Sequence, residues 1–109
     1  MRETGRSGFK SHLIRELRHM FPGCFIIHND PNVNFQGIPD LLVLYKDRWA
    51  MLECKASAKA RKQPNQDYYI EKFDGLSFGA FIYPENAEDV LNDLQHAFQS
   101  GRTARVSQR

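Results

Sequence analysis

Apolar residues follow two patterns along the chain, and each pattern predicts a different element. Three segments repeat apolar residues every three or four positions, the period of an amphipathic helix. These segments are 7–21, 64–75 and 87–99. Four shorter segments rich in branched and aromatic residues are expected to be strands. They are 24–28, 38–45, 49–56 and 78–83.

The order of these elements predicts an α/β fold, a mixed sheet flanked by helices in the order α-β-β-β-α-β-α. Lys46-Asp47-Arg48 suits a short turn between the second and third strands, which should therefore form an antiparallel hairpin. Both strands are apolar at almost every position, so the hairpin is expected to be covered on both faces. The fourth strand follows the third through a helix and should run parallel to it.

Length and composition indicate one soluble domain. The chain has 109 residues, of which 41% are hydrophobic and 26% charged, with a formal net charge of +2. We expect the domain to cover residues 1–99 and the polar segment 100–109 to be a disordered basic tail. The chain has no apolar run of the roughly 20 residues that cross a bilayer, and its start has no apolar signal core. A cytoplasmic protein without a membrane partner is therefore predicted.

The predicted hairpin carries charged residues among its apolar ones. Glu53 and Lys55 are two positions apart, so they project from the same side of one strand. Folding the hairpin at its turn places Leu41 across from Glu53. Asp40 then falls opposite Cys54, within side-chain reach of Glu53. Two carboxylates and an ammonium group are therefore expected in one small patch of the sheet.

The spacing alone leaves three interpretations of this patch open. In the first, Mg²⁺ neutralises the carboxylates, because it takes oxygen ligands and Asp40, Glu53 and the backbone carbonyl of Cys54 can supply three. Lys55 is then available to orient or deprotonate a water, or to stabilise negative charge on a phosphate. In the second, Lys55 and one carboxylate form a buried ion pair. In the third, the hairpin is an exposed edge without special chemistry.

Two further polar residues are candidates for the same site. Glu16 lies on the expected buried stripe of the first helix, where it either faces the metal, directly or through water, or pairs with Arg15 or His19. Gln66 lies in the first turn of the second helix, where it either hydrogen-bonds a phosphate, a water or Lys55, or belongs to the helix surface.

Cationic residues close to the predicted site favour DNA as a partner. The loop before the second helix carries Lys59, Arg61 and Lys62, and the start of the chain carries Arg6 and Lys10. Side chains of this type contact the phosphates of nucleic acids. The alternative is an ordinary solvated surface.

The hairpin residues resemble the signature of the PD-(D/E)XK nucleases. "IPD" at 38–40 is followed after twelve residues by "ECK" at 53–55. "KQPNQDYYIEKF" at 62–73 resembles the segment after the signature in virus-type replication-repair nucleases (VRR-NUC) and archaeal-type Holliday-junction resolvases. The resemblance covers about 8–98 and implies a restriction-endonuclease-like fold. It also implies roles for individual residues: metal ligands Asp40 and Glu53, catalytic lysine Lys55, auxiliary acid Glu16 and accessory residue Gln66.

The resemblance also implies an activity. We expect an Mg²⁺- or Mn²⁺-dependent endodeoxyribonuclease of DNA repair or recombination that hydrolyses phosphodiesters in branched DNA, as a Holliday-junction resolvase does. Cutting two strands of a junction needs two active sites, so we expect a homodimer with Phe35 and the hairpin side bearing Trp49 at its interface. The virus-type resemblance favours a bacteriophage origin and a bacterial host cytoplasm. The alternatives are a flap nuclease, exonuclease or restriction-type nuclease of the same fold, a catalytically inactive DNA-binding module, and a nonenzymatic interaction protein.

Overall fold

The computed structural model describes residues 5–30 and 36–99, which form a four-stranded mixed sheet and three helices. In chain order the elements are α1 (Gly5–Met20), β1 (Phe25–His28), β2 (Leu41–Tyr45), β3 (Arg48–Cys54), α2 (Gln66–Leu76), β4 (Gly79–Ile82) and α3 (Ala87–Gln99). The predicted α/β class and element order are confirmed. The predicted tail at 100–109 and the predicted interface residue Phe35 lie outside the described residues.

The central hairpin organises the sheet. The strand order is β1-β2-β3-β4, so β2 and β3 lie in the middle. β1 and β3 both run antiparallel to β2, and β4 runs parallel to β3 after the connection through α2. The last two pairings follow from the sequence pattern, because a short turn permits only an antiparallel partner and a helical crossover suits a parallel one.

The turn of the hairpin sets the register of its two strands. It contains two residues, and the first, Lys46, has the positive φ of 57° found in the turns that fit twisted hairpins. The predicted three-residue turn is therefore wrong. The observed register pairs Leu41 with Leu52, so the preceding residue, Asp40, lies across from Glu53 rather than from Cys54.

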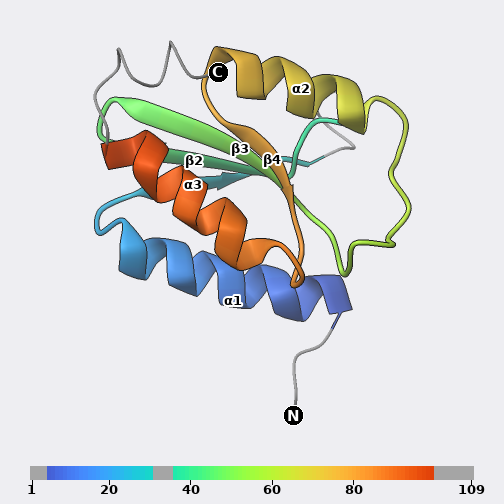
Figure 1. The fold of residues 1–109 in the computed structure, drawn as a ribbon, viewed down its shortest axis with the longest axis horizontal. Helices are drawn as coiled ribbons and strands as arrows, with labels where there is room; N and C mark the ends of the chain where they lie inside the picture. Colours follow the sequence, from blue (N-terminus) through green and yellow to red (C-terminus); the bar gives the residue numbers. More distant parts are fainter. Residues whose placement is uncertain (1–4, 31–35, 100–109) are drawn as a thin grey trace.

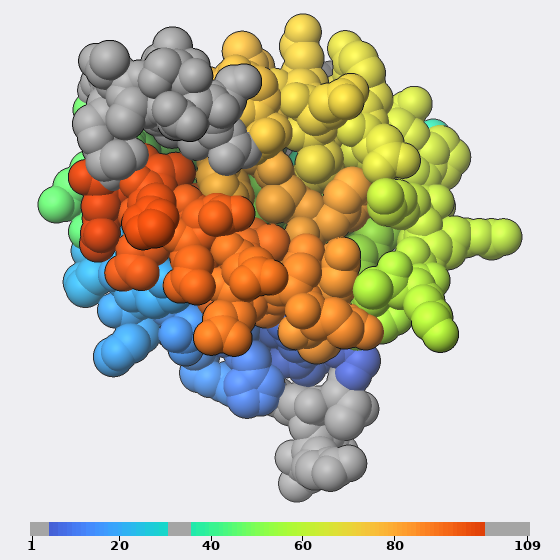
Figure 2. All heavy atoms as spheres, viewed as in Figure 1, coloured from blue at the N-terminus to red at the C-terminus, as the bar shows by residue number. Residues whose placement is uncertain are grey.

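Helices cover the two faces of the sheet unequally. α1 and α3 lie on one face and α2 on the other (Figure 1). The main core lies between the sheet and the first pair, and it contains side chains that are completely buried, among them Leu17, Phe21, Leu41, Leu52 and Leu94. Figure 2 shows α1 and α3 side by side over this face. The apolar stripes predicted for both helices therefore have their expected partner.

On the other face, α2 packs closely against β4 and β3. A Cβ atom at Gly79 would lie 2.7 Å from the carbonyl oxygen of Ile70, a distance that only glycine permits. Trp49 and Phe73 meet edge to face with ring centroids 6.0 Å apart. This packing places the second half of α2 beside the starts of β3 and β4, so the start of α2 lies toward the end of β3.

The part of this face that belongs to β1 and β2 is less covered. Phe25 is 64% exposed, and Leu42 and Leu44 are half-buried. The prediction that the hairpin is covered on both faces therefore holds for β3 and only partly for β2. Within the described ranges, no helix has the length and apolar character needed to cross a membrane.

Candidate functional site

Polar side chains from four segments converge at one end of the sheet. The start of α1, the start of β2, the end of β3 and the start of α2 surround an open pocket of about 750 Å³. Four of its lining side chains are buried polar groups: Asp40, Glu53, Lys55 and Gln66. Burying charged groups is unfavourable unless they are paired. The contacts that these four side chains make therefore define the site.

The two carboxylates are tied to each other's strands. Glu53 Oε1 accepts a hydrogen bond from the backbone N–H of Asp40 at 3.1 Å, and Asp40 Oδ1 accepts one from the backbone N–H of Cys54 at 3.1 Å. These reciprocal bonds hold both acids at the same end of the sheet. Both line one pocket, as a shared ligand sphere requires.

Lys55 and Gln66 extend this network. Lys55 Nζ donates to Gln66 Oε1 at 2.7 Å and to the carbonyl oxygen of Arg61 at 3.0 Å, and it lies 3.7 Å from Glu53 Oε2. Gln66 Nε2 donates to the same Glu53 oxygen at 3.0 Å. The ion pair that the spacing left open is therefore present. The placement of Gln66 on the helix surface is excluded, since its side chain is buried and bridges the ammonium group and the carboxylate.

The electrostatics of this cluster are unfavourable for two ionised acids. Burial out of water raises the pKa of Glu53, and repulsion from the Asp40 carboxylate raises it further, to about 7. The opposing attraction from Lys55 and Arg6 is smaller. A divalent cation beside both carboxylates would remove this imbalance.

The donor atoms fit a hard divalent cation. Mg²⁺ is commonly held by one or two carboxylates, with waters completing an octahedron. Asp40 and Glu53 would supply the carboxylates, and the backbone carbonyl of Cys54 would supply a third oxygen. Among the described residues, no three or more His, Cys, Asp and Glu side chains gather into a possible metal site. An ion here would therefore depend on the carbonyl and on water for its remaining ligands.

Helix α1 contributes cations to the cluster. Arg6 Nη2 forms an ion pair with Asp40 Oδ2, and Arg6 Nε donates to the carbonyl oxygen of Cys54 at 2.9 Å. Lys10 Nζ lies 3.5 Å from the same Asp40 oxygen. Arg6 and Lys10 are four residues apart, so they share one side of the helix. Both were predicted to contact DNA, and both line the pocket.

Glu16 does not join the cluster. Its side chain is exposed, and it is not among the residues that line the pocket. The buried positions of α1 are Gly8, Leu13 and Leu17. Glu16 precedes Leu17 by one residue, which turns its side chain by about 100° around the helix axis. The prediction that Glu16 lies on the buried stripe and faces the metal is therefore wrong.

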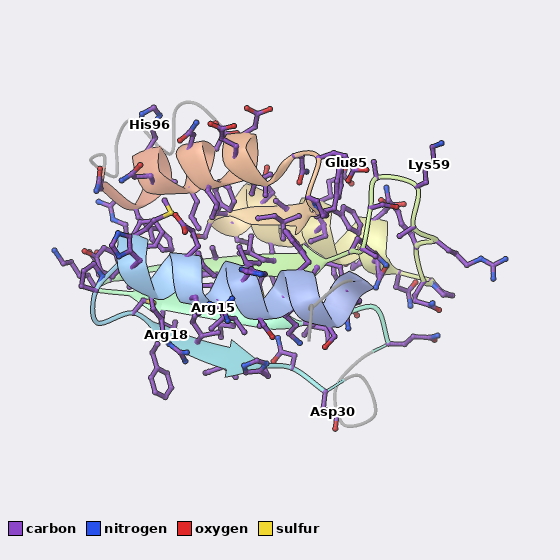
Figure 3. All side chains as sticks on the ribbon, turned by 90° about the horizontal axis from the view of Figure 1, so that it is seen from below. Arg15, Arg18, Asp30, Lys59, Glu85 and His96 are labelled. Atoms are coloured by element: carbon purple, nitrogen blue, oxygen red, sulfur yellow. The ribbon has the colours of Figure 1, made fainter. Side chains whose placement is uncertain are left out.

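The basic loop between β3 and α2 projects from the molecule (Figure 2). Arg61 lines the pocket, while Lys59 extends into solvent (Figure 3). Lys62 Nζ lies 4.4 Å from the ring centroid of Phe81 and 3.0 Å from Asp67 Oδ1. The three predicted DNA contacts therefore occupy different positions, and Arg61 is the one that reaches the pocket.

Asn29 and Gly37 are two of the pocket residues that are not predicted from the sequence. Asn29 donates through its side chain to the carbonyl oxygen of Pro39 and through its backbone to that of Asp40, each at 2.9 Å. Gly37 has a φ of 92°, and a Cβ atom there would lie 2.5 Å from the carbonyl oxygen of Pro64. Both residues position the start of β2. Their only signal in the sequence is membership of a segment rich in turn formers.

The chain was also compared with known proteins. No protein-family model, curated protein or solved structure matches it. The case for a function therefore depends on the pocket itself. The pocket joins two acidic side chains, a buried lysine and a buried glutamine under a rim of cationic residues.

Proposed function

We propose that the protein is a divalent-cation-dependent endonuclease that hydrolyses DNA phosphodiesters, in line with its resemblance to the PD-(D/E)XK nucleases. The observation that carries the proposal is the convergence of Asp40, Glu53, Lys55 and Gln66 in one pocket. Acidic oxygens that can hold a metal, beside a lysine held in place by hydrogen bonds, are the groups that phosphodiester hydrolysis requires.

Each residue of the pocket has a role in this proposal. Asp40, Glu53 and the Cys54 carbonyl would hold Mg²⁺ or Mn²⁺, which when bound polarises a phosphate oxygen and makes water more acidic. Lys55 orients the attacking water or stabilises negative charge on the phosphate. Gln66 is a positioning residue, because its amide holds the Lys55 ammonium group and the Glu53 carboxylate at 2.7 and 3.0 Å.

The rim of the pocket suits a nucleic-acid backbone. Arg6, Lys10 and Arg61 line it, and Lys59 lies on the projecting loop next to it. The overall net charge of +2 is small, so this local concentration of cations is what would attract phosphates. The described residues form one sheet and three helices. A domain with so few elements offers little surface for reading a base sequence. This favours a substrate recognised by its shape, and we propose branched DNA.

A nuclease assay with four DNA substrates tests the proposal. We expect Mg²⁺-dependent cutting of a four-way junction in preference to flap, single-stranded and linear DNA, and none in EDTA. Lys55→Ala should lower the rate by about a hundredfold, the usual effect of losing one positioned group that stabilises charge in the transition state. Gln66 should keep its place in this variant, because its Oε1 also accepts a hydrogen bond from the backbone N–H of Gln63 at 2.9 Å. Lys72→Ala, a change of equal charge at an exposed position of α2, is the control.

The same assay, together with measurements of DNA and metal binding, separates the alternatives. Preference for a flap or for linear ends would indicate a flap nuclease or an exonuclease. DNA binding that is equal in EDTA and Mg²⁺, without cutting, would indicate an inactive DNA-binding module. Absence of both DNA and metal binding would leave an interaction protein with a buried ion pair. Full activity of Lys55→Ala would contradict the proposed role of the lysine.

A homodimer is part of the proposal, because cutting both strands of a junction needs two pockets. Trp49, predicted at the interface, is partly covered by Phe73 of α2. The more exposed apolar surface lies on β1, where Phe25 and Ile27 are solvent-accessible. We propose that a second copy covers this surface.

Phe25→Glu is therefore expected to convert a dimer into a monomer, because it places a charge in the apolar contact. Sedimentation equilibrium gives the mass, and circular dichroism checks the fold. Leu76→Glu makes the same kind of change at an exposed leucine at the end of α2 and should leave the dimer intact. A monomeric wild-type protein, or a dimeric Phe25→Glu variant, would contradict this interface.

A further inference from the structure

Arg6 contacts two of the three oxygens that would hold a metal. Its Nη2 pairs with Asp40 Oδ2, and its Nε donates to the Cys54 carbonyl oxygen at 2.9 Å. The other Asp40 oxygen already accepts the backbone N–H of Cys54. The guanidinium group thus binds the face of the cluster that a cation would use, and its planar fork matches the two acceptors.

The two sides of this contact differ in freedom. The Asp40 side chain is 8% exposed and is fixed by its bond to β3, while the Arg6 side chain is 48% exposed and lies in the first turn of α1. Arg6 can therefore leave the contact by rotating its own side chain, without movement of the sheet. Lys10 Nζ also lies 3.5 Å from Asp40 Oδ2, but the hydrogen bond to the Cys54 carbonyl comes from Arg6.

A guanidinium group and a divalent ion cannot share these two oxygens. Both are cations, and at contact distance they repel each other. Binding of the ion must therefore release Arg6. Once released, Arg6 stands at the edge of the pocket, where a phosphate can accept the two parallel hydrogen bonds that Asp40 and Cys54 accepted before.

We infer that Arg6 competes with the metal for Asp40 and, when the metal binds, moves from Asp40 to a DNA phosphate. This inference rests on the proposed nuclease function and adds a means of regulating it. The metal binds Asp40, and a DNA phosphate binds Arg6. Each ligand therefore frees the group that the other ligand needs. Linkage then requires that metal and DNA strengthen each other's binding.

Calorimetric titration of the metal-stripped protein with Mn²⁺, without DNA, tests the competition directly. Arg6→Gln should bind Mn²⁺ roughly threefold to tenfold more tightly than wild type, the range expected when a half-exposed ion pair no longer has to be broken. Arg18→Gln removes the same charge from the other end of the same helix, away from the pocket (Figure 3), and should bind like wild type. Thermal unfolding checks that both variants are folded.

The outcomes separate this inference from the proposed function. If Arg6→Gln binds Mn²⁺ no more tightly than wild type, or if Arg18→Gln gains as much, the competition is refuted and the metal site stands. If neither wild type nor Arg6→Gln binds Mn²⁺, the metal site is refuted, and the inference and the proposed mechanism are refuted with it.

The coupling to DNA has its own measurement. In a Lys55→Ala background, which keeps both carboxylates and should cut slowly, fluorescence anisotropy gives the affinity for a labelled four-way junction in EDTA and in Mn²⁺. The factor by which Mn²⁺ increases the affinity for the junction should be at least three times larger, roughly, in Lys55→Ala than in Arg6→Gln/Lys55→Ala. Equal strengthening in the two proteins would refute the transfer of Arg6 to a phosphate.

Discussion

Asp40→Asn is expected to lower DNA cleavage at least about a thousandfold, because a metal that stabilises the transition state contributes several kcal/mol and about 4 kcal/mol corresponds to this factor. Asparagine keeps the acceptor that receives the Cys54 N–H and has nearly the same shape, so the hairpin should remain folded. It loses the negative charge that would attract the ion. Initial cleavage rates of a four-way junction in Mg²⁺ measure the effect, and calorimetry with Mn²⁺ should show weakened binding.

Glu16→Gln is the matched control for this experiment, since it neutralises an acid that resemblance to the nuclease family also assigns to the site. Because the Glu16 side chain is exposed and outside the pocket, its neutralisation should change the rate less than about twofold. A comparable loss in both variants would contradict the site as the structure has it. Cleavage by Asp40→Asn within tenfold of wild type would contradict the metal-ligand role of Asp40.

Without metal, the wild-type protein is expected to lose stability relative to Glu53→Gln as the pH rises from 5 to 8. The pKa of Glu53 is about 7 in the folded protein, against 4.5 for an unperturbed glutamate. The folded state therefore binds the proton more tightly than the unfolded chain. The stabilisation is fully present below about pH 4.5 and is lost as the pH rises through about 7. The pKa difference corresponds to about 3 kcal/mol of unfolding free energy.

Urea unfolding in EDTA at several pH values measures this effect. Glu53→Gln resembles the protonated side chain at every pH, so its stability relative to wild type should rise by about 2 to 3 kcal/mol between pH 5 and pH 8. Glu71→Gln, which changes an exposed glutamate of α2, should follow wild type throughout. Adding Mn²⁺ at pH 8 should stabilise wild type and not Glu53→Gln. A wild-type protein that stays parallel to Glu53→Gln from pH 5 to 8 would contradict the raised pKa.

The fold and the centre of the pocket could be predicted because short-range rules determine them. The alternation of strand residues puts Glu53 and Lys55 on one side, and a short turn brings Asp40 back to meet them. The predicted turn was one residue too long, and this matters because residues directly opposite each other project from the same side of a sheet. The observed register, with Asp40 opposite Glu53 rather than Cys54, is what puts the two acids on one side.

The contribution of α1 could not be predicted in the same way. Periodicity gives the buried side of this helix, marked by Leu13 and Leu17, but not how far the helix extends along the sheet. In the structure its first turn reaches the end of β3, so Arg6 meets the pocket and Glu16, near the other end of the helix, does not. That offset depends on packing between distant segments.

The near contact between Gly37 and the Pro64 carbonyl ties two loops of the pocket together. One loop delivers Asp40 and the other delivers Gln66, although more than twenty positions separate them in the chain. A graft that exchanges only one of these loops would press on its neighbour and carry Gln66 away from Lys55. Anyone redesigning this scaffold for a new substrate would have to transplant both loops as a matched set.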